Sequence, residues 1–188
     1  TVLASYQNED GGFGHALEPD CWNPNSAPIM TWVVTEILRE IDFTDSKHPI
    51  IQGILRYLEN TEEFNSHYWY ANIKSNNDFP RAPWWGFSDD PNHRCNNYNR
   101  TACLAGFIIR FADKRSELYK LGCKIAKEAY ESYIGQGLLN DMHTGLCYIR
   151  LWQHSQYFVY QRIDWSGWRY ALQCKQAWYR WANRDRCT

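Results

Sequence analysis

The chain has 188 residues, which is the size of one ordinary domain. Hydrophobic residues make up 44% and charged residues 22%, a globular composition that excludes a disordered chain. The net charge of −1 gives no support for nucleic-acid binding. Ten tryptophans are unusual at this length, and either a core or a ligand cavity can use them.

Apolar residues recur with helical spacing along most of the chain. After a helix end at residues 1–6 and a glycine-rich turn at 7–14, this spacing predicts helices at 29–41, 48–59, 100–112, 116–134 and 140–152. Ser26 with Pro28 is expected to start the first of these helices, and Pro49 opens the second. No segment alternates convincingly like a strand, so we predict an all-α fold of consecutive antiparallel hairpins.

Residues 60–97 interrupt the helical pattern with a long segment rich in Asn, Pro and aromatic residues. A loop of this length is uncommon unless it has a function. We expect a lid or a lining for an apolar ligand, contacted by Trp69, Trp84, Trp85 and Phe87. The alternative is an ordered loop whose aromatic residues cover the ends of helices.

The composition changes again at the end of the chain. Residues 154–188 contain six Lys or Arg against two Asp or Glu, whereas residues 1–153 carry a net charge of −5. We therefore divide the chain into a domain at 1–153 and a basic, Trp-rich tail at 154–188. The tail is either a surface element for an anionic partner or the product of a shifted reading frame.

The seven cysteines are odd in number and form no Cys-x-x-Cys pair, so we expect neither a disulfide framework nor a zinc knuckle. Reduced thiols are typical of the cytoplasm, and we predict that location. The first residues carry no charged and apolar leader, and no apolar run reaches the roughly 18 residues of a membrane span, so we predict no transmembrane segment.

The segment Leu3 to Gly14 (LASYQNEDGGFG) resembles the Gln-Trp repeat of squalene and hopene cyclases and of protein prenyltransferase β subunits. Gln7 takes the place of the glutamine that ends the helix, Asp10 and the two following glycines form the turn, and Phe13 is the aromatic residue. The longer string QNEDGGFGHALEPDCWNPNSAPIMTW is similar to bacterial prenyltransferase-like proteins with the α/α-toroid fold.

This resemblance covers about Leu3 to Trp152. It implies a partial α/α toroid, in which helix hairpins surround a central cavity and further hairpins or a partner close the ring. It also implies a protein that binds or transforms an apolar, isoprenoid-type ligand.

The chemistry of those families is matched only in part. The cyclase motif Asp-x-Asp-Asp is absent, and its nearest equivalent is Ser88-Asp89-Asp90. Asp89 or Asp90 is a candidate acid beside an aromatic wall, and the alternative is a solvated turn. Zinc in the prenyltransferases implies a histidine such as His143, but one histidine does not make a zinc site, so we expect no metal or cofactor.

The loop from Gly14 to Asp20 is the most suggestive segment. It holds His15, Glu18 and Asp20 close together, with Asp10 before it and Trp22 after it. These groups suit acid–base chemistry or cation binding, and the alternative is that they only stabilise turns.

Carboxylates beside tryptophan also bind sugars. The second hypothesis is therefore a carbohydrate-active hydrolase that uses two of Asp10, Glu18, Asp20 and Asp89 as acid and base. The third hypothesis is a non-catalytic interaction scaffold. The candidate catalytic residues are Asp10, His15, Glu18, Asp20, Asp89 and Asp90, and the candidate ligand-binding residues are Trp22, Trp69, Trp84, Trp85 and Phe87.

Overall fold

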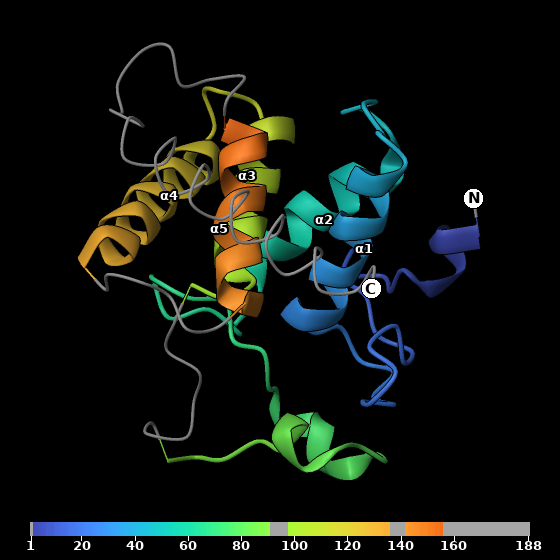
Figure 1. Cartoon of the computed structure of the whole chain (residues 1–188). Coiled ribbons are helices and arrows are strands. Elements are labelled where there is room, and N and C mark those ends of the chain that lie inside the picture. The colour runs from blue at the N-terminus through green and yellow to red at the C-terminus, as the bar shows by residue number, and fades with distance from the viewer. Residues whose placement is uncertain (1, 91–97, 136–141, 156–188) are drawn as a thin grey trace, which may run out of the picture.

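The computed structural model describes residues 2–90, 98–135 and 142–155. Over these ranges the chain forms helices joined by loops and no strand, which confirms the predicted all-α class (Figure 1). The α-helices are α1 (Pro28–Glu40), α2 (Pro49–Asn60), α3 (Thr101–Phe111), α4 (Glu117–Gly135) and α5 (Met142–Ser155). Three short 3₁₀ helices accompany them: η1 (Val2–Tyr6), η2 (Lys74–Asp78) and η3 (Pro83–Trp85).

The helices begin close to where the sequence predicts them. Pro28 and Pro49 occupy the first helical positions, where a missing N–H costs nothing. The Nδ1 atom of His48 caps α2 by accepting a hydrogen bond from the Ile50 N–H at 3.2 Å. The expected role of Ser26 is wrong, because Ala27 is the residue before α1 and the Ser26 hydroxyl donates to the Asp10 carboxylate instead.

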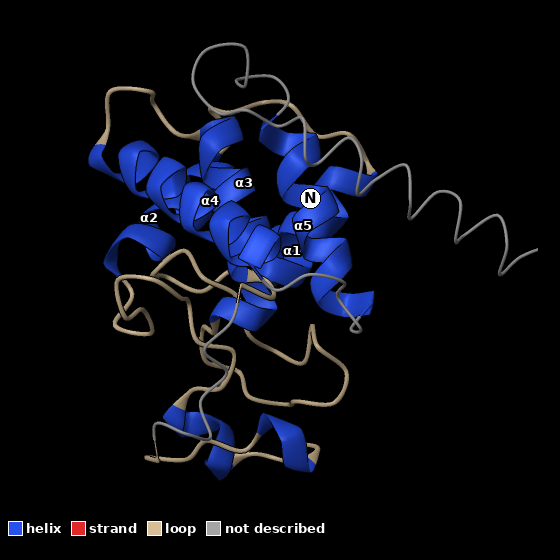
Figure 2. Cartoon of the chain, turned by 60° about the vertical axis from the view of Figure 1, so that its left-hand side comes forward, coloured by secondary structure: helices blue, strands red, loops and turns tan. Residues whose placement is uncertain are grey.

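Helix α3 lies at the centre of the described helices and packs against the other four (Figures 1 and 2). Ten of its eleven residues are buried, as expected for a helix that is apolar on all sides. Gly106 lets α5 approach closely, since its Cα faces Leu151 and His154. Cys103, one turn before Gly106, contacts Cys147, one turn before Leu151. Because the contacts advance together along both helices, α3 and α5 run in the same direction.

The long connection between α2 and α3 contains η2 and η3. The part with η2 and η3 lies at the lower end of the molecule in Figure 1, whereas Trp69 and Ile73 earlier in the connection belong to the hydrophobic core. The described part of the predicted 60–97 segment is therefore an ordered loop with two short helical turns.

Within the described ranges, no helix has the length and apolarity needed to span a membrane. Helix α5 continues to Ser155, two residues beyond the predicted domain boundary at 153. Residues 156–188 of the predicted tail lie outside the described residues.

Candidate functional site

The glycine-rich turn at residues 7–14 packs directly on α2. Gln7 Nε2 donates to the carbonyls of Gly11 at 2.9 Å and of Ile50, in the first turn of α2, at 3.1 Å. The glutamine therefore joins its own turn to a neighbouring helix end. A side chain at Gly53 would overlap this amide, so a larger residue there would displace Gln7 from its hydrogen bonds.

Two of the predicted catalytic residues are Asp10, which lies in this turn, and His15, which directly follows it. The Asp10 carboxylate accepts hydrogen bonds from the Gly12 N–H at 2.9 Å and the Ser26 hydroxyl at 2.7 Å. The exposed His15 ring lies 3.1 Å from Asn8 Oδ1 and has a left-handed backbone, with φ of 59°. Asp10 thus stabilises the turn through these hydrogen bonds. This is the structural alternative to a catalytic role for Asp10.

The loop after this turn pairs with the segment around η3. We call residues 15–27 and 72–87 the paired loops. Trp22 N–H donates to the Pro80 carbonyl at 3.0 Å, and Ala82 N–H donates to the Asp20 carbonyl at 2.8 Å. These hydrogen bonds flank an antiparallel bridge between Cys21 and Arg81, which places the two loops side by side.

Buried asparagines hold the paired loops together. Asn23 Nδ2 donates to Asn76 Oδ1 and to the Ser75 hydroxyl, both at 2.8 Å, and Asn76 Nδ2 donates to the Trp85 carbonyl at 3.0 Å. Both amides are fully buried. Because buried polar groups need partners, this chain of amides constrains both loops at once.

Two further asparagines shape the end of the second loop. Asn72 Nδ2 donates to the carbonyls of Trp84 and Gly86 at 2.8 and 2.9 Å. Asn77 pairs with both the N–H and the carbonyl of Phe87, at 3.0 and 3.1 Å. Tryptophans 84 and 85 are therefore presented by a loop whose backbone is tied down on both sides.

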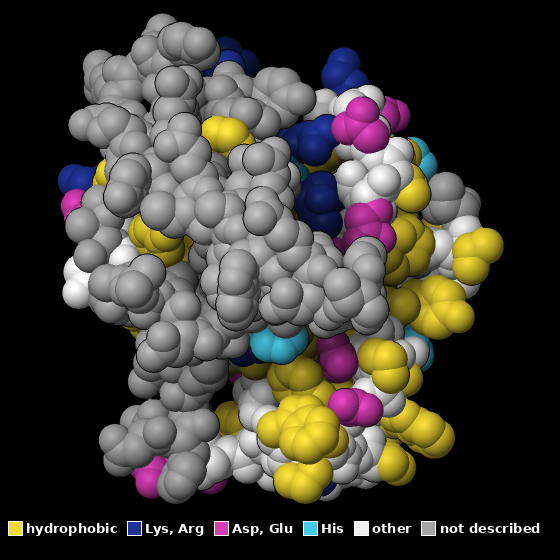
Figure 3. Space-filling view, viewed as in Figure 1, with side chains coloured by type: hydrophobic (Ala, Val, Ile, Leu, Met, Phe, Trp, Pro, Cys, Tyr) yellow, Lys and Arg dark blue, Asp and Glu magenta, His cyan; other side chains and the backbone are white. Residues whose placement is uncertain are grey.

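The predicted ligand-binding aromatic residues do not form one wall. Trp69 is buried in the core, stacks on Phe64 at 4.6 Å between ring centroids, and donates its indole N–H to the Leu58 carbonyl. Trp22 and Trp84 are exposed instead, with 62% and 65% of their surface accessible. Figure 3 shows hydrophobic side chains gathered over the region of η2 and η3, with acidic side chains beside them.

Trp85 and Phe87 lie between these extremes, and both are half-buried. The indole nitrogen of Trp85 is buried and has no hydrogen-bond partner. Trp85 therefore points a polar atom into the protein.

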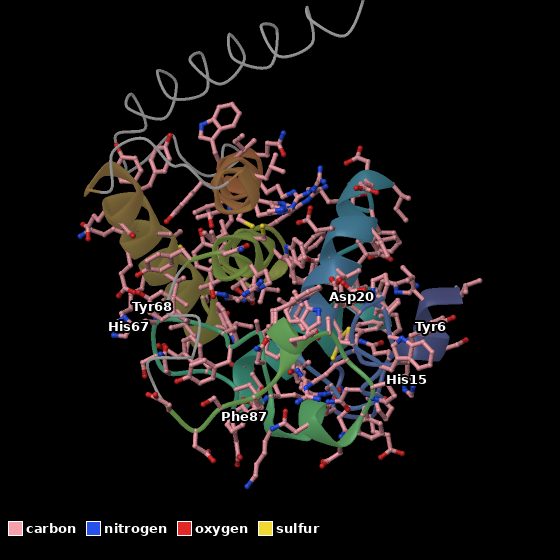
Figure 4. All side chains as sticks on the ribbon, turned by 60° about the horizontal axis from the view of Figure 1, so that its bottom comes forward. Tyr6, His15, Asp20, His67, Tyr68 and Phe87 are labelled. Carbon is pink, nitrogen blue, oxygen red and sulfur yellow. The ribbon has the colours of Figure 1, made fainter. Side chains whose placement is uncertain are left out.

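Glu18 is the half-buried carboxylate of the paired loops. Burial raises its pKa, the neighbouring Asp20 carboxylate raises it further, and the Arg100 guanidinium opposes both. Asp20 is exposed, and Figure 4 shows Asp20 and His15 on the same side of the molecule. Two carboxylates in different environments are the arrangement that separates a proton donor from an ionised partner.

The other predicted residues lie elsewhere. Asp89 and Asp90 are exposed near the end of the 2–90 range, where the Asp90 N–H donates to Ser88 Oγ at 3.2 Å. His143 is exposed in the first turn of α5. In the part of the chain that the structure describes, no group of three or more His, Cys, Asp or Glu is placed to hold a metal ion.

Sequence reasoning missed Arg100, the residue before α3. It has a left-handed backbone with φ of 64°, and its N–H lies 3.3 Å from Cys147 Sγ. Its guanidinium carbon lies 5.9 Å from the centre of a Trp85 ring, and its Nε is buried without a hydrogen-bond partner. Glu18, Trp85 and Arg100 thus converge from three segments, and with Asp20 we call them the Glu18 site.

Sequence reasoning also missed a charged cluster between α1 and α5. The buried Glu36 carboxylate oxygen Oε2 accepts from Arg39 Nε at 3.0 Å and from Arg150 Nε at 2.7 Å. The cluster joins the N-terminal helices to α5, which indicates a structural role.

A groove of about 450 Å³ lies between the end of α2 and the start of α4. Four of its six lining residues are charged: Glu59, Glu117, Lys120 and Lys124, beside Leu118 and Leu121. It contains none of the predicted site residues.

Comparisons of the chain with models of protein families, with curated proteins and with solved structures found no match. The Glu18 site therefore has to be interpreted from its own geometry. It combines a half-buried acid, a second carboxylate, an arginine and the half-buried Trp85. The exposed Trp22 and Trp84 lie on the same paired loops, which buried amides join.

Proposed function

We propose that the paired loops form the ligand-binding end of a partial α/α toroid and that the ligand is a carbohydrate. The observation that carries this proposal is the exposure of Trp22 and Trp84 on two loops that hydrogen-bond to each other beside Glu18 and Asp20. Exposed large apolar side chains mark binding sites when they gather on one surface. An indole offers a flat apolar face for a sugar ring, and nearby polar groups bind its hydroxyls.

The chemistry that fits this site is hydrolysis of a glycosidic bond. The raised pKa of Glu18 favours its protonated form, so Glu18 donates its proton to the leaving oxygen as the bond to the anomeric carbon breaks. Water adds to that carbon and gives its proton to Asp20, the second carboxylate. Apart from the water that is consumed, every group in this scheme belongs to the chain or to the substrate.

The apolar, isoprenoid-type ligand implied by the resemblance stays a prediction. It requires aromatic residues around an apolar cavity, whereas Trp69 is part of the core and Trp22 and Trp84 face solvent. Closure of the ring by further hairpins or a partner, and a cytoplasmic location, likewise stay predictions.

The test is a binding screen against soluble polysaccharides and oligosaccharides, followed by assay of reducing-end release. We expect Trp22→Ala and Trp84→Ala each to weaken binding at least tenfold, and Glu18→Gln to abolish hydrolysis while binding persists. Ile41→Ala is the matched control, because Ile41 is equally exposed at the end of α1. Binding of a prenyl diphosphate together with no binding of any glycan would overturn the proposal.

A further inference from the structure

We propose that Arg100 binds a carboxylate of the ligand, so that the substrate class is an acidic, uronate-containing carbohydrate. This inference rests on the proposed function and adds the charge of the substrate to it. Three features of Arg100 support it: its guanidinium has no carboxylate partner among the described residues, its backbone has a positive φ, and it lies near Glu18 and Trp85.

The first feature is the state of the guanidinium. In the described residues, the other half-buried arginines have carboxylate partners: Arg39 and Arg150 share Glu36, and Arg110 pairs with Asp42. Arg100 has no described carboxylate oxygen within 4.0 Å, and its Nε is buried without a partner. A guanidinium presents planar paired donors that match a carboxylate, so a half-buried arginine with no described carboxylate partner suits an acidic group.

The second feature is the backbone. A residue other than glycine with φ of 64° is strained, and such strain persists where the surrounding structure imposes it. Here the Arg100 carbonyl accepts the Leu104 N–H at 2.9 Å as the first bond of α3, and the Arg100 N–H faces Cys147 Sγ. Glycine would adopt this conformation without strain. Because the chain has arginine here despite the strain, the arginine side chain itself has a role.

The third feature is the electrostatic setting. The Glu18 carboxylate interacts electrostatically with Arg100 but lies beyond ion-pair distance. When Glu18 holds its proton as the acid of the proposed reaction, Arg100 loses this nearby negative charge, and the exposed Asp20 is the carboxylate that remains in the site. The guanidinium carbon lies 5.9 Å from the centre of a Trp85 ring, so the indole can orient the guanidinium through a cation–π contact on that side.

The experiment compares an oligogalacturonate with its methyl ester, which keeps the sugar chain and removes the charge. We expect the native protein to bind the acid at least tenfold more tightly, with a preference that weakens as salt rises. Arg100→Gly keeps the backbone conformation and should lose the preference, whereas Arg100→Lys should retain part of it. Arg115→Ala is the control, because Arg115 is an exposed arginine outside the paired loops.

Thermal unfolding of each variant shows whether α3 still folds. Equal binding of acid and ester by the native protein would overturn the inference, and so would a preference that survives in a folded Arg100→Gly variant. Tighter binding of a sulfated oligosaccharide than of the uronate would also overturn it. Binding of neutral glycans alone would defeat this inference and leave the proposed function intact, whereas binding of no glycan would defeat both.

Discussion

Gly11 and Gly53 face each other with no side chain between them, so the turn at residues 7–14 rests directly on the backbone of α2. A Cβ atom on Gly11 would overlap the Gly53 carbonyl, and a Cβ atom on Gly53 would overlap the Gln7 amide. Gly11 also has φ of 93°, which only glycine adopts readily. The contact fixes where the chain leaves the turn and enters the paired loops.

Replacement of Gly11 by alanine should therefore destabilise the protein by about 2 kcal/mol or more, because left-handed strain and steric overlap add together. Urea unfolding followed by circular dichroism measures the change. Gly135→Ala is the control, since nothing lies within 4 Å of a Cβ built at Gly135 at the end of α4. It should be neutral or stabilising by up to about 1 kcal/mol, and an equal loss in both variants would contradict the packing explanation.

The Asn76→Ala variant tests the amide chain that joins the paired loops. Removing this side chain leaves the Trp85 carbonyl without its donor and Asn23 without one acceptor, at a cost of about 1–3 kcal/mol. Hydrogen exchange should accelerate in residues 72–87. Asn60→Ala serves for comparison, because exposed Asn60 bonds only to the Arg56 carbonyl of its own helix; unchanged exchange in Asn76→Ala would show that the amides do not hold the loops.

Glu36 should be far more important to stability than its charge alone suggests. Glu36→Ala leaves Arg39 and Arg150 without their shared buried carboxylate, so we expect a loss of about 3–5 kcal/mol. Glu117 pairs with Lys120 at 2.6 Å, but both side chains are exposed, so Glu117→Ala should cost less than about 1 kcal/mol. Chemical denaturation of the two variants compares the buried pair with the exposed one, and similar losses would refute the distinction.

The buried His154 should make the protein less stable in mild acid. Burial, followed by the charges of Arg110 and Arg39, lowers its pKa from the ordinary 6.5 to about 4. The unfolded chain thus takes up this proton at a higher pH than the folded chain does. The free energy of unfolding should fall by up to about 3 kcal/mol as the pH drops from 6.5 to 4.

Well above its ordinary pKa of 6.5 this histidine is neutral in both states and contributes no slope. Urea unfolding at several pH values measures the effect, and His154→Gln should flatten the dependence between pH 4 and 6.5. A variant with the same slope as the native protein would assign the acid sensitivity to other groups.

The helices could be predicted from the sequence because their signals are local. Apolar residues repeat at helical spacing, and Pro28 and Pro49 mark two starts. The misplaced start at Ser26 has a local cause as well, since serine is a good cap in isolation but here bonds to Asp10 across the turn. The all-round burial of α3 follows from its apolar composition.

The Glu18 site was only half predictable. Glu18, Asp20 and Trp85 were recognised by residue type, but Arg100 lies 82 positions after Glu18, and no periodicity connects them. The asparagines that pair the loops bond across more than 50 residues through side chains, so no hydrophobic pattern reveals them. Trp69 was assigned to a ligand because sequence cannot distinguish a core tryptophan from an exposed one.

The central position of α3 has a consequence for synthesis on the ribosome. Helices α1 and α2 precede α3 in the chain, but the sides that α4 and α5 cover stay open until residues 117–155 have been translated. During that interval an eleven-residue apolar helix exposes surface that the finished fold buries. A nascent chain that stalls before α5 is therefore the species most prone to aggregate and most in need of a chaperone.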